Sequence, residues 1–224
     1  MKHRLLHPKV MCRALCTLLW VSGALAAEVV PGGVEPAGCD KLGTETHCYA
    51  LALRGRIVVG DSQKLAARMT QIETMDNQSI KMRVGMVKLD SLGGDVAEAM
   101  KIGKMLRTRQ VTTFVTADSE CASSCVLVLA GGVQRIVFGP VAIHSFYSPD
   151  LLGSGDFTRS SRRYDEVARS IEDYLREMRV SRSLLDAMMQ VPHDTVKQLS
   201  LEELSSFGLV GTDPAYAQSR KPKK

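Results

Sequence analysis

The chain has 224 residues, a formal net charge of +5 and 45% hydrophobic residues. This length allows one domain with a substantial core, and the composition excludes a chain that is disordered over most of its length. The charge does not favour nucleic-acid binding, because four lysines and arginines lie in the first 13 residues and removing them lowers the net charge to +1.

Residues 1–26 have the pattern of a secretory signal peptide. A basic stretch ends at Arg13, residues 14–24 are mostly apolar, and Ala24-Leu25-Ala26 provides the small residues that a signal peptidase reads. We expect cleavage after Ala26 or Ala27 and a periplasmic or secreted protein. The apolar stretch is short for a bilayer span, which favours cleavage over an uncleaved membrane anchor.

Four cysteines follow the signal peptide, and an even number in an exported chain predicts disulfides. Cys39 with Cys48 would hold residues 27–48, a lead-in rich in Gly, Pro and Glu, and Cys121 with Cys125 would brace the intervening turn. Crossed pairings are also compatible with the sequence. A metal site is disfavoured because neither pair has Cys-x-x-Cys spacing, and we expect no cofactor.

The first half of the body alternates strands with helices. Residues 49–59 predict a strand with a break at Arg54-Gly55, and Asp61 predicts the N-cap of a helix whose apolar stripe is Leu65, Met69 and Ile72. A turn at 76–79 and a buried strand at 82–89 follow. Gly93-Gly94 then precedes an amphipathic helix over 96–106.

The second half continues the alternation. We expect strands at 111–116, 135–138, 141–144 and 209–210, an apolar helix after Ser123, a loop at 145–158, helices at 160–178, 181–189 and 201–207, and a disordered basic tail over 214–224. This order predicts an α/β fold with a mostly parallel sheet flanked by helices, in a single domain over residues 49–213.

Three motifs could carry chemistry, although each alone favours a structural interpretation. Paired glycines at 93–94 let the backbone approach a ligand, or simply make a tight turn. Ser123 at a helix start suits a nucleophile, but serine helix caps are commoner. His144 ends an apolar strand, where most histidines are structural.

The order of these motifs resembles the Clp protease proteolytic subunit. Residues 89–96, Leu-Asp-Ser-Leu-Gly-Gly-Asp-Val, resemble its strand–Gly-Gly–helix element, and Cys121-Ala122-Ser123-Ser124-Cys125 resembles its nucleophile turn. Val141-Ala142-Ile143-His144 resembles the strand that delivers its histidine. The resemblance to this subunit covers about residues 49–213. The chain also resembles signal peptide peptidases, more distantly.

The resemblance implies a ClpP/crotonase-like fold of repeated β-β-α units and a serine peptidase mechanism. Ser123 would attack the carbonyl of a peptide or protein substrate, His144 would take its proton, and the N–H groups of Gly94 and Ser124 would hold the oxyanion. A register one residue later would make Ser124 the nucleophile.

The third catalytic member departs from the family pattern. Val196 occupies the position of the family's aspartate, so the enzyme has Asp194 as the orienting acid after a small shift, or it is a Ser–His dyad, or another group holds His144. The alternatives are a binding or scaffold protein that lacks turnover, and an acyl-CoA enzyme, which export disfavours. The family's rings imply self-assembly, through the helix over 160–178, and no ATPase partner is expected outside the cytoplasm.

Overall fold

The computed structural model describes residues 28–31, 46–75, 81–146 and 157–220, and it confirms the mixed α/β order. The strands are β1 (Glu28–Pro31), β2 (Thr46–Arg54), β3 (Lys81–Asp90), β4 (Thr112–Val115), β5 (Cys121–Ala122), β6 (Gln134–Val137), β7 (Val141–Ile143), β8 (Lys197–Gln198) and β9 (Gly211–Thr212). The helices are α1 (Asp61–Glu73), α2 (Val96–Thr108), α3 (Cys125–Gly131), α5 (Phe157–Glu177), α6 (Ser183–Gln190), α7 (Leu201–Phe207) and α8 (Pro214–Ser219).

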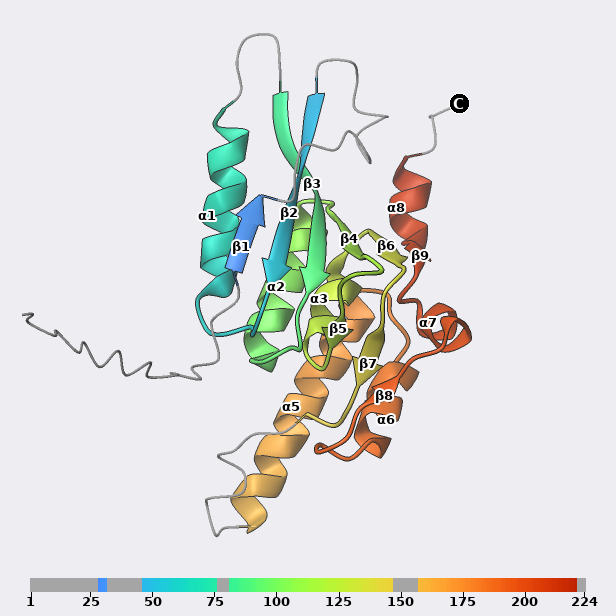
Figure 1. Cartoon of the computed structure of the whole chain (residues 1–224). Helices are drawn as coiled ribbons and strands as arrows, with labels where there is room; N and C mark the ends of the chain where they lie inside the picture. The colour runs from blue at the N-terminus through green and yellow to red at the C-terminus, as the bar shows by residue number, and fades with distance from the viewer. Residues whose placement is uncertain (1–27, 32–45, 76–80, 147–156, 221–224) are drawn as a thin grey trace, which may run out of the picture.

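The main sheet has six strands in the order β1-β2-β3-β4-β6-β9 (Figure 1). The four central strands are parallel, which confirms the expected mostly parallel sheet, and the edge strands β1 and β9 are antiparallel. β3 carries Val84, Val87 and Leu89 into the core. Parallel strands need crossover connections, and α1, α2 and α3 supply three of them in chain order.

A second, smaller layer begins where the strands of the main sheet end. β5, β7 and β8 form a three-stranded sheet, and isolated parallel bridges join Ser91 to Cys121 and Ile57 to Gly94. The chain therefore passes from a main-sheet strand to a short extended segment in the second layer, and then into a helix. It does this three times in succession, with α1, α2 and α3 as the closing helices.

The helices pack closely through two glycines. Gly103 of α2 and Gly131 of α3 lie so near each other that a Cβ on Gly131 would be 2.4 Å from the Gly103 Cα. The inner face of α5 contributes Ile171, Tyr174 and Leu175 to the core, and Met178, the residue after the helix, continues this face at the spacing predicted from the sequence. In Figure 1 the N-terminal end of α5 extends beyond the rest of the described structure.

Glu98 is a buried carboxylate that joins α2 to α1. It accepts hydrogen bonds from the backbone N–H groups of Gly60 (3.1 Å) and Ser62 (2.8 Å), and it pairs with Lys101. Burial raises the pKa of Glu98, but the Ser62 and Lys101 hydrogen bonds outweigh it, so the net pKa lies below its ordinary value. Glu98 thus caps the first turn of α1 from a neighbouring helix.

Arg135 on β6 is a buried cation that joins the ends of three elements. Its guanidinium donates to the carbonyl oxygens of Ala130, Met178 and Gly208. Burial lowers the pKa of Arg135 to about 10, so the side chain stays charged near neutral pH. Helices leave their last carbonyls without intrahelical partners, and this side chain satisfies three such groups at once.

Several local predictions were wrong. The N-cap of α1 is Gly60 rather than Asp61, because the buried Asp61 carboxylate accepts the Val58 N–H from the preceding turn. The last strand lies at Gly211–Thr212, not 209–210, because Leu209 is fully buried and Gly211 pairs with Arg135. Residues 214–219 form α8 instead of a disordered tail, since Asp213 caps a helix that begins with Pro214.

The disulfide between Cys121 and Cys125 is present, with Cα atoms 5.3 Å apart, so the crossed pairings do not occur. Cys48 is also disulfide-bonded, while its expected partner Cys39 lies outside the described residues. The expected signal peptide (1–26), turn (76–79) and most of the loop after Phe146 lie outside them too. Over the part of the chain that is described, none of the helices combines the length and apolarity needed to cross a bilayer.

Candidate active site

A cleft of about 410 Å³ opens beside the second layer. It is lined by residues from three successive segments of that layer and from the end of β7: Gly55, Arg56, Asp90, Ser91, Leu92, Gly93, Gly94, Val96, Glu120, Ser123, His144 and Phe146. Three of the residues predicted from the sequence, Ser123, His144 and Gly94, therefore share one cleft. The volume is within the range of small-molecule and peptide side-chain sites.

Strand register brings Ser123 and His144 to the same edge. β5 and β7 are adjacent parallel strands in which Cys121 pairs with Val141 and Ala122 with Ala142. The pairing ends with the Ser123 N–H donating to the Ala142 carbonyl over 3.0 Å. By this register Ser123 lies opposite Ile143, the residue before His144, so the two residues leave neighbouring strand ends, which lie about 4.8 Å apart, with an offset of one position. Their proximity thus follows from backbone pairing.

Ser123 occupies an unusual backbone conformation. Its φ is +58°, in the left-handed region that costs a non-glycine residue about 1–2 kcal/mol. The residue sits between strand β5 and helix α3, so the chain makes a sharp strand–turn–helix connection there. Such strained turns are characteristic of nucleophilic serines, because they expose the side chain at the top of a sheet.

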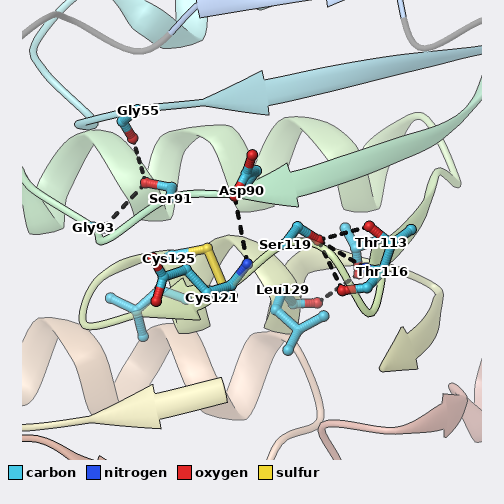
Figure 2. The surroundings of a disulfide bond; sticks show 12 residues. Gly55, Asp90, Ser91, Gly93, Thr113, Thr116, Ser119, Cys121, Cys125 and Leu129 are labelled. Carbon is cyan, nitrogen blue, oxygen red and sulfur yellow. Dashed lines mark hydrogen bonds between the residues drawn. A yellow bond between two sulfur atoms is a disulfide. The ribbon is translucent and has the colours of Figure 1, made fainter. Parts of the chain in front are cut away.

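The disulfide closes directly around this turn. Cys121 lies in β5, Cys125 is the first residue of α3, and both are fully buried. Figure 2 shows the sulfur atoms next to the loop that contains Ser91 and Gly93. Neither cysteine lines the cleft. The bridge therefore holds the turn without covering Ser123.

Ser124 is placed very differently from Ser123. Its side chain is only 2% exposed, and its Oγ is buried with no hydrogen-bond partner among the described residues. Ser123 is half-buried and lines the cleft. A nucleophile must reach an external carbonyl, so the structure favours Ser123 over Ser124 for that role.

The Gly93-Gly94 loop packs against the Ser123 turn. A Cβ on Gly93 would lie 2.8 Å from the Ala122 oxygen, the Ser123 Cβ and the Ser124 nitrogen. Ser91 braces the loop, because its hydroxyl donates to the Gly55 carbonyl and accepts the Gly93 N–H (Figure 2). Sequence reasoning missed Ser91, although its place at the end of a strand before two glycines was a signal.

Two backbone donors of this region take no part in the backbone pairing of the described residues, and Gly94, but not Ser124, lines the cleft. Among the described residues, the N–H groups of Gly94 and Ser124 have no backbone acceptor, whereas the flanking Gly93 and Asp95 N–H groups bond Ser91 and Ile57. These are the two donors that the sequence resemblance implies for an oxyanion. Free N–H groups beside a strained serine can stabilise a developing negative charge.

His144 lies in the cleft directly after β7. Within the described part of the chain, no hydrogen bond joins the Ser123 hydroxyl to the His144 ring, whose Nδ1 instead lies 2.7 Å from the Ser145 carbonyl oxygen. Catalytic hydrogen bonds are often long before a substrate binds. The lack of a bond between Ser123 and His144 in the described residues therefore fits a general base and an inactive pair equally.

Asp194 is not brought to the site. It is exposed on the segment between α6 and β8, and it does not line the cleft that contains His144. Val196, at the position that the family pattern assigns to an aspartate, is 65% exposed. In the described residues the cleft thus brings Ser123, His144 and Gly94 together, without Asp194.

The cleft is also lined by charged side chains and by apolar ones. Arg56 and Glu120 line it without an ion pair among the described residues, whereas Asp90 pairs with Arg54 over 3.6 Å. Leu92, 65% exposed, and Phe146 supply apolar surface. Sequence reasoning singled out none of Arg56, Glu120 or Leu92, because no motif marks a side chain that only lines a wall.

Metal chemistry finds no support in the described residues, which contain no cluster of three or more His, Cys, Asp or Glu side chains able to hold an ion. No protein-family model matches the chain, and no curated protein matches it. A functional assignment must therefore rest on the cleft and its residues.

Proposed function

We propose that the protein is an exported serine hydrolase that cleaves peptide bonds, with Ser123 as nucleophile and His144 as general base. Gly94 and Ser124 supply the backbone N–H groups for the oxyanion. The observation that carries this proposal is that the left-handed Ser123 shares one cleft with His144 and with the Gly93-Gly94 loop.

Each step of the proposed reaction is assigned to one of these groups. The Ser123 oxygen would attack the peptide carbonyl while His144 accepts its proton. The carbonyl oxygen, now negative, would receive the Gly94 and Ser124 N–H groups, and His144 would return the proton to the departing amine. Water would then release the acyl group by the same route in reverse.

We also propose that the fold is ClpP/crotonase-like, and the order of its elements supports this. Three successive units of main-sheet strand, second-layer segment and helix are the repeated β-β-α pattern that the resemblance implies. The serine follows the second-layer strand of the third unit, and the glycines lie in the second unit.

The test is labelling with a fluorophosphonate probe, which reacts covalently with activated serines. The protein would be expressed as its full chain under oxidising conditions, beside the Ser123→Ala, Ser124→Ala and His144→Ala variants. We expect Ser123→Ala to abolish labelling and His144→Ala to slow it by at least about 100-fold. Ser124→Ala is the matched control, since it removes a buried hydroxyl that has no partner.

Labelling lost in Ser124→Ala but retained in Ser123→Ala would contradict the assignment of the nucleophile. Folded wild-type protein that does not label at all would contradict the hydrolase. The second candidate would then hold: a binding protein that uses the cleft without turnover. Two observations favour it: among the described residues no hydrogen bond joins Ser123 to His144, and Asp194 does not line the cleft.

A further inference from the structure

The contact between the His144 ring and the Ser145 backbone defines which ring nitrogen carries a proton. Nδ1 lies 2.7 Å from the Ser145 carbonyl oxygen. A carbonyl oxygen can only accept a hydrogen bond, so Nδ1 must be the protonated nitrogen of the neutral ring. Nε2 then keeps its lone pair, and this is the tautomer that a general base needs to take a serine proton.

The chain on both sides of this carbonyl is held by neighbouring elements. The Ser145 N–H, which belongs to the peptide before the carbonyl, donates to the Val191 carbonyl over 2.9 Å, just after α6 ends at Gln190. Phe146, the next residue, stacks on Tyr164 of α5 with ring centroids 4.6 Å apart. Before His144, Ile143 pairs with Lys197 of β8. The segment from Ile143 to Phe146, which carries the carbonyl that orients the ring, is therefore held by three different elements.

We infer that the Ser145 carbonyl, secured through Val191, takes the orienting place of an acid, and that Asp194 has no part in positioning His144. The orienting role inferred for the carbonyl rests on the proposed function. The contact between the His144 ring and the Ser145 carbonyl does not depend on that function. Removing a carboxylate from a serine triad is costly largely because the ring adopts the wrong tautomer. A backbone acceptor avoids that loss, although it stabilises the imidazolium less than an anion would.

The experiment is nitrogen NMR of the full chain, exported and labelled with ¹⁵N-histidine, with the His144 signals assigned by a His144→Gln variant. For the neutral ring we expect a protonated Nδ1 and an unprotonated Nε2. The same signals should appear in Asp194→Asn, whose probe-labelling rate should stay within about twofold of wild type. A protonated Nε2 in the wild type would overturn the inference.

Two variants at one position separate backbone from side chain. Ser145→Ala keeps the backbone N–H and carbonyl and should leave the tautomer unchanged, whereas Ser145→Pro removes the N–H that donates to Val191. We expect Ser145→Pro, if folded, to give mixed tautomers and at least tenfold slower acylation. Changed His144 signals in Asp194→Asn would also refute the inference. Correct tautomers without probe labelling would refute the hydrolase but not the orienting contact.

Discussion

Gly93 offers a quantitative test of how the glycine loop supports the Ser123 turn. Gly93→Ala and Gly211→Ala place a side chain at nearly the same φ, +89° and +92°, so both incur a left-handed strain of about 1–2 kcal/mol. A Cβ at Gly211 meets no atom within 4 Å, whereas at Gly93 it meets three atoms of the Ser123 turn at 2.8 Å. Forcing that contact open costs about 1–3 kcal/mol more.

The expected result is a difference between two matched variants. Thermal unfolding should place Gly93→Ala about 2–12 °C below Gly211→Ala, given about 2–4 °C per kcal/mol in a chain of this size. Probe labelling should fall about 100-fold or more in Gly93→Ala, because the shifted loop moves the Gly94 donor, and should be unchanged in Gly211→Ala. Equal stability and equal labelling in the two variants would refute the packing argument.

Three further predictions concern other parts of the structure. Glu98→Gln should destabilise the protein by about 1.5–3 kcal/mol near neutral pH, since the amide oxygen can still accept the two backbone N–H groups but lacks the negative charge that strengthens these bonds and pairs with Lys101. The pKa of Glu98 is lowered in the folded state, so its contribution to stability is complete above the ordinary pKa of 4.5 and is lost as the pH falls through the folded-state pKa. Urea unfolding should therefore show the free energies of unfolding of wild type and Glu98→Gln converging in acid. Arg135→Met should cost about 3–5 kcal/mol by the same assay, as three buried carbonyls lose their donor, and an undiminished unfolding midpoint would contradict the anchoring role. Arg56→Glu should shift the preference in cleavage or binding from acidic toward basic peptides by several-fold, and Glu120→Lys should shift it in the opposite direction. Both shifts should shrink at high salt, and a selectivity that does not depend on salt would contradict both predictions.

Sequence patterns predicted the elements that bury apolar faces and missed those that exist only through pairing. β3 and α5 carry clear periodicities and lie close to their expected positions. β8 has two exposed polar residues, so nothing in its composition indicates a strand; it forms because β7 offers it a partner. β1 was hidden by the Gly- and Pro-rich residues that follow it. α8 was missed although Asp213-Pro214 is a recognisable helix start.

The candidate site divides in the same way. Ser123, His144 and Gly94 could be chosen from motif order, because each follows a strand that ends at one edge. Asp194 could not be placed from the sequence, since a loop between α6 and β8 has no periodicity to fix its position. No sequence pattern could have indicated the Ser145 carbonyl, because every residue has a carbonyl. Only the contact with the His144 ring distinguishes this one.

The choice between Ser123 and Ser124 shows why the disulfide lies where it does. β5 has only two residues, and a strand that short specifies its register weakly. A slip by one residue would bury Ser123 and turn Ser124 toward the cleft. The bridge joins Cys121 in β5 to Cys125 at the start of α3, so it restricts the conformation of the turn between them. The Ser123 N–H bond to Ala142 ties the middle of that turn to β7. This hydrogen bond therefore adds to the register that two residues of strand specify weakly, and the bridge holds the turn in which Ser123 lies.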